Sequence, residues 1–162
     1  MIENNGENKT IFKETTIQLI IGIFGSMLAP LMIFHALCNC YPYKMTPYAS
    51  KFSSIGYLVW ILTVVICAVS VVCLRSFLRG PLISIFQVLA SPIIAWVFYK
   101  MLMSFYSIEL PQTKPTGDFS LHIGLEQMLA DHVLNAGVIS FVFVLPISFG
   151  ISIIYKIREK RG

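Results

Sequence analysis

The chain has 162 residues, of which 56% are apolar and only 12% charged, and its net charge is +4. A soluble domain carries roughly 25% charged residues, and a mean hydropathy of +0.76 leaves too little polar surface to cover a water-soluble fold of this size. The composition excludes a soluble enzyme, a disordered chain and a nucleic-acid-binding protein.

Four stretches of about 20 residues or more contain no Asp, Glu, Lys or Arg, which is the length that a helix needs to cross a hydrocarbon core of about 30 Å. The expected spans are, in chain order, 17–38, 55–74, 82–104 and 133–155. The second holds twelve Ile, Leu and Val residues, which favour insertion by about 4–7 kcal/mol. The sequence therefore predicts an all-α fold, with residues 1–162 forming a single domain of four antiparallel transmembrane helices.

Three segments connect the predicted spans. The link 75–81 ends in Gly80-Pro81, a turn signal that favours a tight hairpin between spans two and three. An outer loop at 39–54 joins spans one and two, and a longer one at 105–132 joins spans three and four. The spacing of apolar residues over 121–132 predicts a short amphipathic helix lying at the outer membrane interface.

The basic residues predict the orientation. Eight of the twelve lie on the side of the two termini: Lys9, Lys13, Arg75, Arg79, Lys156, Arg158, Lys160 and Arg161. The other side has Lys44, Lys51 and Lys114, together with Lys100 near the end of span three. Because cytoplasmic segments are enriched in Lys and Arg, we expect a multi-pass membrane protein with both termini in the cytoplasm.

Small residues recur at helical spacing in three of the spans. Span one has Gly22, Gly25, Ser26 and Ala29, span three has Ala90-Ser91-Pro92, and span four has Ala136, Gly137 and Ser140. Small residues allow helices to approach closely in lipid. Two interpretations stay open: the stripes hold the four spans together, or one stripe faces outward and recognises a foreign helix.

Groups that support catalysis, transport or metal binding are sparse. His35 and Lys100 are the ionisable residues of the spans, both near an end, and the remaining polar side chains are neutral. His122 and Glu126, and the neighbours Asp131 and His132, form only scattered pairs, whereas a metal site needs three or four ligands. We expect no catalytic residues, no metal and no cofactor.

The cysteines leave a redox alternative. The topology resembles that of quinone-coupled enzymes that make disulfides, because Cys38 and Cys40 lie just outside span one. A Cys-Asn-Cys ring is strained, however, and the second outer loop has no cysteine to relay electrons. The competing interpretation treats Cys67 and Cys73 as small apolar residues of span two. A thiol-disulfide oxidoreductase is therefore the less favoured function.

Span three and the residues that follow it carry a resemblance to a known family. Leu89-Ala90-Ser91-Pro92 is followed by an aromatic run from Trp96 to Tyr106 and then by Ile108-Glu109-Leu110. This arrangement resembles the immunity proteins for pore-forming colicins of the colicin A and B type, which have a Ser-Pro in the third span and a Glu-Leu just after it. The positions that match the family are Ser91, Pro92, Glu109 and Leu110. The first outer loop is shorter than in that family, and Pro111-Gln112-Thr113 replaces its Thr-rich stretch.

The resemblance implies protection against a toxin. Such a protein lies in the bacterial inner membrane, meets the pore-forming domain of its cognate colicin there and prevents channel opening by helix–helix contact. The implied partners are membrane lipids and the toxin, not nucleic acid, and the implied setting is a bacteriocin plasmid whose product gives resistance to the antimicrobial toxin. The alternative is a small structural subunit of a larger membrane complex.

Overall fold

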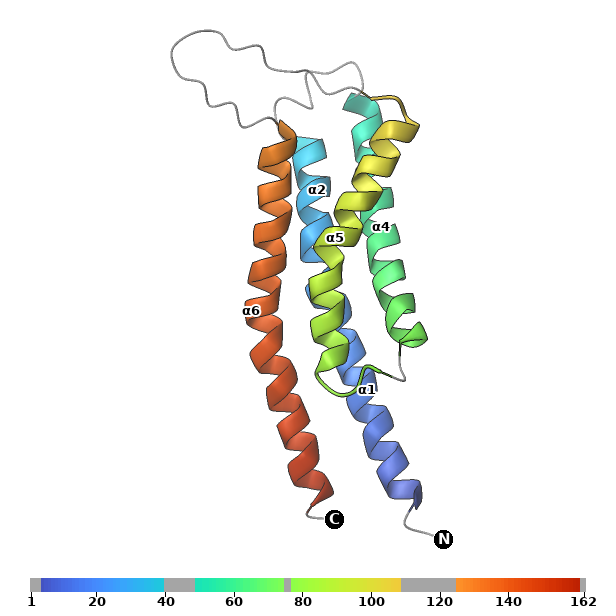
Figure 1. Cartoon of the computed structure of the whole chain (residues 1–162), viewed down its shortest axis with the longest axis vertical. Coiled ribbons are helices and arrows are strands. Elements are labelled where there is room, and N and C mark those ends of the chain that lie inside the picture. Colours follow the sequence, from blue (N-terminus) through green and yellow to red (C-terminus); the bar gives the residue numbers. More distant parts are fainter. Residues whose placement is uncertain (1–3, 40–48, 75–76, 109–124, 161–162) are drawn as a thin grey trace.

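The computed structural model describes residues 4–39, 49–74, 77–108 and 125–160, and these ranges contain helices and turns but no strand (Figure 1). The helices are α1 (Asn4–Ser26), α2 (Leu28–Asn39), α4 (Ala49–Cys73), α5 (Leu82–Phe105) and α6 (Leu125–Glu159). They supply four spans that are long and apolar enough to cross a membrane, with α1 and α2 together forming the first. The predicted all-α four-helix architecture is confirmed.

The first span is broken at Met27, where a single helix over 17–38 was the expectation. Pro30 explains the break, because proline has no N–H to donate to the carbonyl of Ser26 and its ring collides with that carbonyl. At the break the chain forms a tighter turn, in which the N–H of Met27 donates to the carbonyl of Phe24, three residues earlier, at 3.3 Å. The two parts of the span have different main neighbours, since α1 packs mainly against α5 and α2 packs mainly against α4.

The fourth span also differs from its expected form. Residues 125–132 do not form a separate interfacial helix, because they are the first turns of α6, which runs unbroken for 35 residues. Its length is about 52 Å at 1.5 Å per residue. Between Leu125 and Ala136 there is neither Gly nor Pro, so nothing interrupts the helical hydrogen bonds. Residues 121–124 of the expected amphipathic helix lie outside the described residues.

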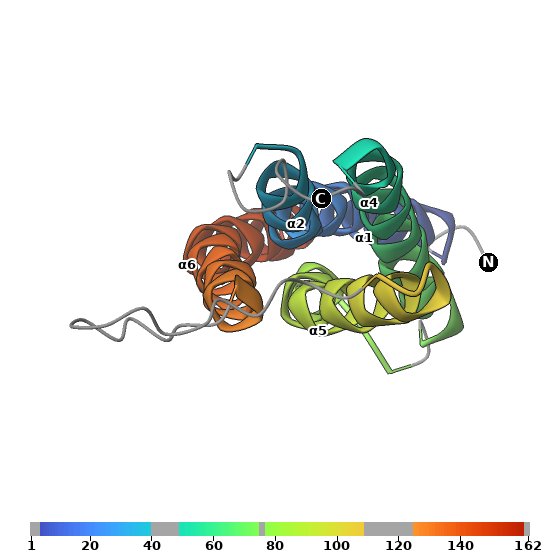
Figure 2. The same cartoon turned by 90° about the horizontal axis from the view of Figure 1, so that it is seen from above.

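The remaining helices match their predictions more closely. Helix α5 agrees with the expected 82–104 to within one residue, and α4 starts six residues earlier than the expected 55–74. Seen along the bundle, α2 lies between α6 and α4, and α5 closes the opposite side, which places α4 and α6 diagonally (Figure 2). The chain runs up and down alternately, so that both termini lie at one end (Figure 1).

The distribution of polarity is inverted relative to a water-soluble protein. The side chains of Gln18, Ser84 and Ser148 are fully buried, whereas Phe105 is 80% exposed and Ile93 is 68% exposed. In lipid, apolar side chains face the solvent and polar groups must find partners inside the protein. This surface fits a transmembrane bundle.

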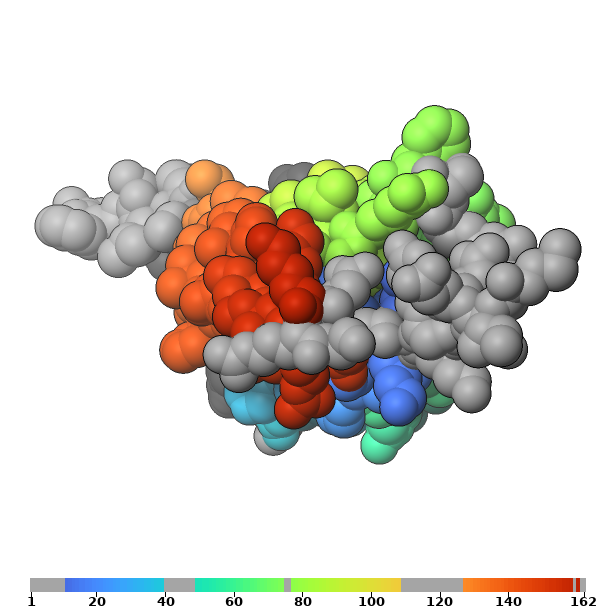
Figure 3. Space-filling model, turned by 90° about the horizontal axis from the view of Figure 1, so that it is seen from below, coloured from blue at the N-terminus to red at the C-terminus, as the bar shows by residue number. Residues whose placement is uncertain are grey.

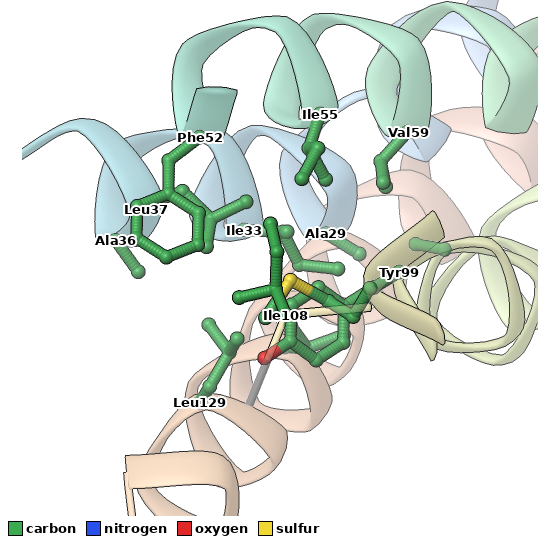
Figure 4. Packing of buried hydrophobic residues seen from close by; sticks show 13 residues of the cluster. Ala29, Ile33, Ala36, Leu37, Phe52, Ile55, Val59, Tyr99, Ile108 and Leu129 are labelled. Carbon is green, nitrogen blue, oxygen red and sulfur yellow. The ribbon is translucent and has the colours of Figure 1, made fainter. Parts of the chain in front are cut away.

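The apolar core lies in the half of the bundle away from the termini. It joins side chains from α2, α4, α5 and α6 (Figure 4). Ile33 of α2, Phe52 and Ile55 of α4, Tyr99 of α5 and Leu129 of α6 are all fully or almost fully buried. The half of the bundle nearer the termini also buries apolar side chains, and it adds polar contacts and a close helix approach at a glycine.

Candidate functional site

The Ser-Pro pair that carries the family resemblance lies where α5 crosses α6. Ser91 is buried, and its hydroxyl donates to the carbonyl of Val88 in its own helix at 3.2 Å. Pro92 packs directly onto Gly137 of α6, since a Cβ added to that glycine would lie 3.0 Å from Pro92 Cγ. Pro92 therefore lies at a close approach of α5 to α6. Glu109 and Leu110, the other matching positions, lie outside the described residues.

A groove opens beside this crossing, on the outer surface between α5 and α6. It has a volume of about 320 Å³, and Pro92, Trp96 and Leu134 are among its lining residues. Asp131 is the one charged residue of its described lining, and the rest is apolar. We call it the α5–α6 groove. Its apolar lining can receive side chains of an apolar helix laid against α5 and α6 within the membrane.

A polar cluster occupies the bundle interior in its other half. The Gln18 Nε2 donates to the carbonyl of Ser148 at 2.8 Å and to Ser152 Oγ at 3.2 Å, and Ser84 Oγ donates to Gln18 Oε1 at 2.9 Å. The hydroxyls of Ser84 and Ser148 are 2.6 Å apart, and Ser152 Oγ donates to Glu14 Oε1 at 2.5 Å. These five side chains, the polar cluster, tie α1 to α5 and α6.

The polar cluster was not predicted from the sequence. Glu14 was expected to lie before the first span, which begins at Ile11 instead of residue 17. The available signal was the spacing of four residues between Glu14 and Gln18 and between Ser148 and Ser152, which places each pair on one helix face. Nothing in the sequence shows that these two faces meet.

A buried amide lies next to the polar cluster. Gln87 of α5 is fully buried, and within the described part of the chain neither its Nε2 nor its Oε1 has a hydrogen-bond partner. Its amide lies over Gly22 of α1, in space that any larger side chain at that position would fill. Gly22 therefore permits the close approach of α1 to α5.

The cysteines and histidines are dispersed. Cys67 is a buried free thiol and Cys73 is an exposed free thiol, both on α4. Cys38 lies at the end of α2, at the opposite end of the bundle from Cys73 (Figure 1), and Cys40 lies outside the described residues. The ring of His132 pairs with the carbonyl of Met128 at 2.6 Å. No group of three side chains suited to a metal occurs within the described ranges.

Basic side chains gather at the end of the bundle that carries both termini. Arg79 lies in the link before α5, and Lys156, Arg158 and Lys160 lie at the end of α6, all four exposed. Figure 3 views the molecule from this end. Arg75 and Arg161 lie outside the described residues. At the other end, Lys100 places its Nζ 5.5 Å from the centre of the Trp96 ring.

No known protein family, curated protein sequence or solved structure matches this chain. The resemblance over residues 89–110 is thus one of short motifs, two residues of which lie at the α5–α6 crossing.

Proposed function

We propose that this chain is an immunity protein, which protects a bacteriocin-producing cell by binding the pore-forming domain of a colicin A- or B-type toxin within the inner membrane. The proposal rests on the position of two residues in the structure. Pro92 and Trp96, which belong to the segment that resembles the family, also line the α5–α6 groove. One of the four matching positions, Pro92, thus borders a groove whose apolar lining can contact a foreign helix.

The proposed mechanism needs contact alone. An open pore dissipates the membrane potential, which is worth about 2.3 kcal/mol per elementary charge for every 100 mV. A toxin helix packed into the α5–α6 groove is held away from the other helices that it needs to form a channel. The apolar lining supplies van der Waals contact, and Asp131 offers an acceptor at one end.

Protection of living cells tests this proposal. The chain is expressed in a colicin-sensitive enterobacterium, which is challenged with a panel of pore-forming colicins. We expect at least one toxin of the colicin A or B type to need a concentration ten or more times higher to kill. Sensitivity to every toxin in the panel contradicts immunity, and co-purification with a stoichiometric membrane partner instead favours a structural subunit of a larger complex.

A pair of variants locates the recognition surface. Ala130 lines the α5–α6 groove, and Ala130→Trp fills it, whereas Val142→Trp adds the same ring to an exposed lipid-facing position of α6 outside the groove. We expect Ala130→Trp to lose most of its protection and Val142→Trp to keep it, with equal amounts of both proteins in the membrane by immunoblot. Equal protection by the two variants excludes the groove as the binding surface.

Both termini are proposed to face the cytoplasm, because the end that carries them also carries most of the Lys and Arg. Accessibility of single cysteines tests this orientation. One variant keeps Cys73 alone, and another has no native cysteine but carries Ser104→Cys at the opposite end of the bundle. In intact spheroplasts we expect a membrane-impermeant maleimide to label Ser104→Cys only, and to label Cys73 after permeabilisation. Labelling of Cys73 only in intact spheroplasts would show the opposite orientation, with both termini outside the cytoplasm.

A further inference from the structure

A second and larger groove lies at the basic end of the bundle. Its volume is about 1030 Å³, and α1, the end of α4, the link before α5 and the last turns of α6 all contribute to its lining. Most of that lining is apolar, including Phe12, Val72 and Phe149, and two cations, Arg79 and Lys156, belong to it as well. We call it the basic groove. It is separate from the α5–α6 groove and shares no lining residue with it.

The charges of the basic groove favour an anion. Arg79 and Lys156 are exposed, and Arg158 and Lys160 lie further along the same end of α6. The one carboxylate of the described lining is Glu14, whose Oε1 accepts a hydrogen bond from the hydroxyl of Ser152 in the polar cluster. The described lining thus combines two exposed cations with one carboxylate, and that carboxylate is held by the polar cluster.

The volume and the apolar lining of the basic groove favour an anion that carries apolar chains. Its volume is at the upper limit of the roughly 300–1,000 Å³ that small-molecule sites occupy. The larger part of the lining consists of aromatic and aliphatic side chains. A free phosphate leaves this apolar surface uncovered, whereas a phospholipid covers it with acyl chains and places its phosphate at the cations. Basic pockets between helices at a membrane surface bind anionic lipid head groups in this manner.

We propose that the basic groove binds one anionic phospholipid, with its phosphate between Arg79 and Lys156 and its acyl chains against α1 and α6. The site does not depend on toxin recognition. It joins the link before α5 to the last turns of α6, so the bound lipid braces the end of the bundle that carries the termini.

Lipid titration of the purified protein in detergent micelles tests the proposal, with native mass spectrometry as the measurement. The probes are phosphatidylglycerol, phosphatidylcholine and phosphatidylethanolamine with identical acyl chains, and inorganic phosphate. We expect one phosphatidylglycerol to bind per chain, and the double variant Arg79→Gln/Lys156→Gln to weaken that binding about tenfold or more. The matched control, Arg158→Gln/Lys160→Gln, removes the same charge from the same end outside the groove lining, and we expect less than a threefold change.

Several outcomes overturn the site. Equal loss in the two double variants shows attraction by net charge alone, and equal binding of phosphatidylcholine shows no head-group recognition. Binding of inorganic phosphate in competition with the lipid identifies a phosphate site without a lipid requirement. Preferential binding of phosphatidylethanolamine, lost in Glu14→Gln, assigns the carboxylate to an ammonium group and contradicts an anionic ligand. Circular dichroism of each variant shows that the helices are retained.

Discussion

Replacing Gly22 by alanine should destabilise the bundle by about 2 kcal/mol. The new Cβ overlaps Gln87 Oε1 and lies 2.9 Å from the backbone Cα of Ser84. Gln87 is fully buried and the Ser84 backbone cannot rotate away, so α1 and α5 must separate. Overpacking costs about 1–3 kcal/mol, and a clash with backbone falls at the upper end of that range. About 2 kcal/mol then remains after the gain of about 1 kcal/mol that alanine brings to a helix.

The chain offers a matched control for this substitution. Within the described residues, a Cβ added to Gly150 of α6 meets nothing within 4 Å. Gly150→Ala should therefore leave the free energy of unfolding unchanged or raise it slightly, in a denaturation series with sodium dodecyl sulfate in mixed micelles. The double variant Gly22→Ala/Gln87→Ala should recover part of the loss, because it removes the overlapping amide. Equal stability of the two single variants would show that α1 and α5 are not in close contact.

Replacing Gln18 by leucine should cost a similar amount, about 2 kcal/mol. The substitution preserves the approximate size of the side chain and deletes three hydrogen bonds of the polar cluster, two donated by the amide and one accepted from Ser84. Hydrogen bonds between membrane helices average about 0.6 kcal/mol each and reach about 1.7 kcal/mol. The loss is also expected to leave the hydroxyl of Ser152 with fewer hydrogen-bond partners.

Thr63 is the control for the polar cluster. It is fully buried, and its hydroxyl donates at 2.7 Å to the carbonyl of Val59 in its own helix. Thr63→Val removes a buried hydroxyl without separating two helices, so we expect a change within about 0.5 kcal/mol. A loss for Thr63→Val as large as that for Gln18→Leu would mean that burial of a polar group, and not the link between helices, sets the effect.

The positions of the spans could largely be predicted from the stretches of sequence that contain no charged residue. A span requires about 20 apolar residues, and this requirement places α5 almost to the residue. The ends of α4 and α6 were less predictable, because a helix continues past the apolar stretch as long as its backbone bonds remain unbroken. Residues such as Ser53 and His132 are polar yet helical, so hydropathy underestimates both helices.

The break in the first span and the meeting of distant faces depend on other information. Pro30 was visible in the sequence, but a proline inside a membrane helix either bends it or is accommodated, as Pro92 and Pro146 are within α5 and α6. The position of Pro92 against Gly137 depends on the relative rotation of two helices. The periodicity of a sequence describes one helix at a time. It therefore indicates that Pro92 and Gly137 lie on helix faces, but not that these two residues are in contact.

The hydrogen bonds of Gln18 span the length of the chain, and this bears on how the protein is made. Gln18 and Ser148 are separated by 130 residues, which a ribosome takes roughly 7–26 s to synthesise at about 5–20 residues per second. During that interval α1 is already made, and its amide has Ser84 at most as a partner within the cluster. Arrival of α6 completes the set, so a product truncated before its last helix keeps an incompletely paired amide in lipid and is a recognisable substrate for membrane quality control.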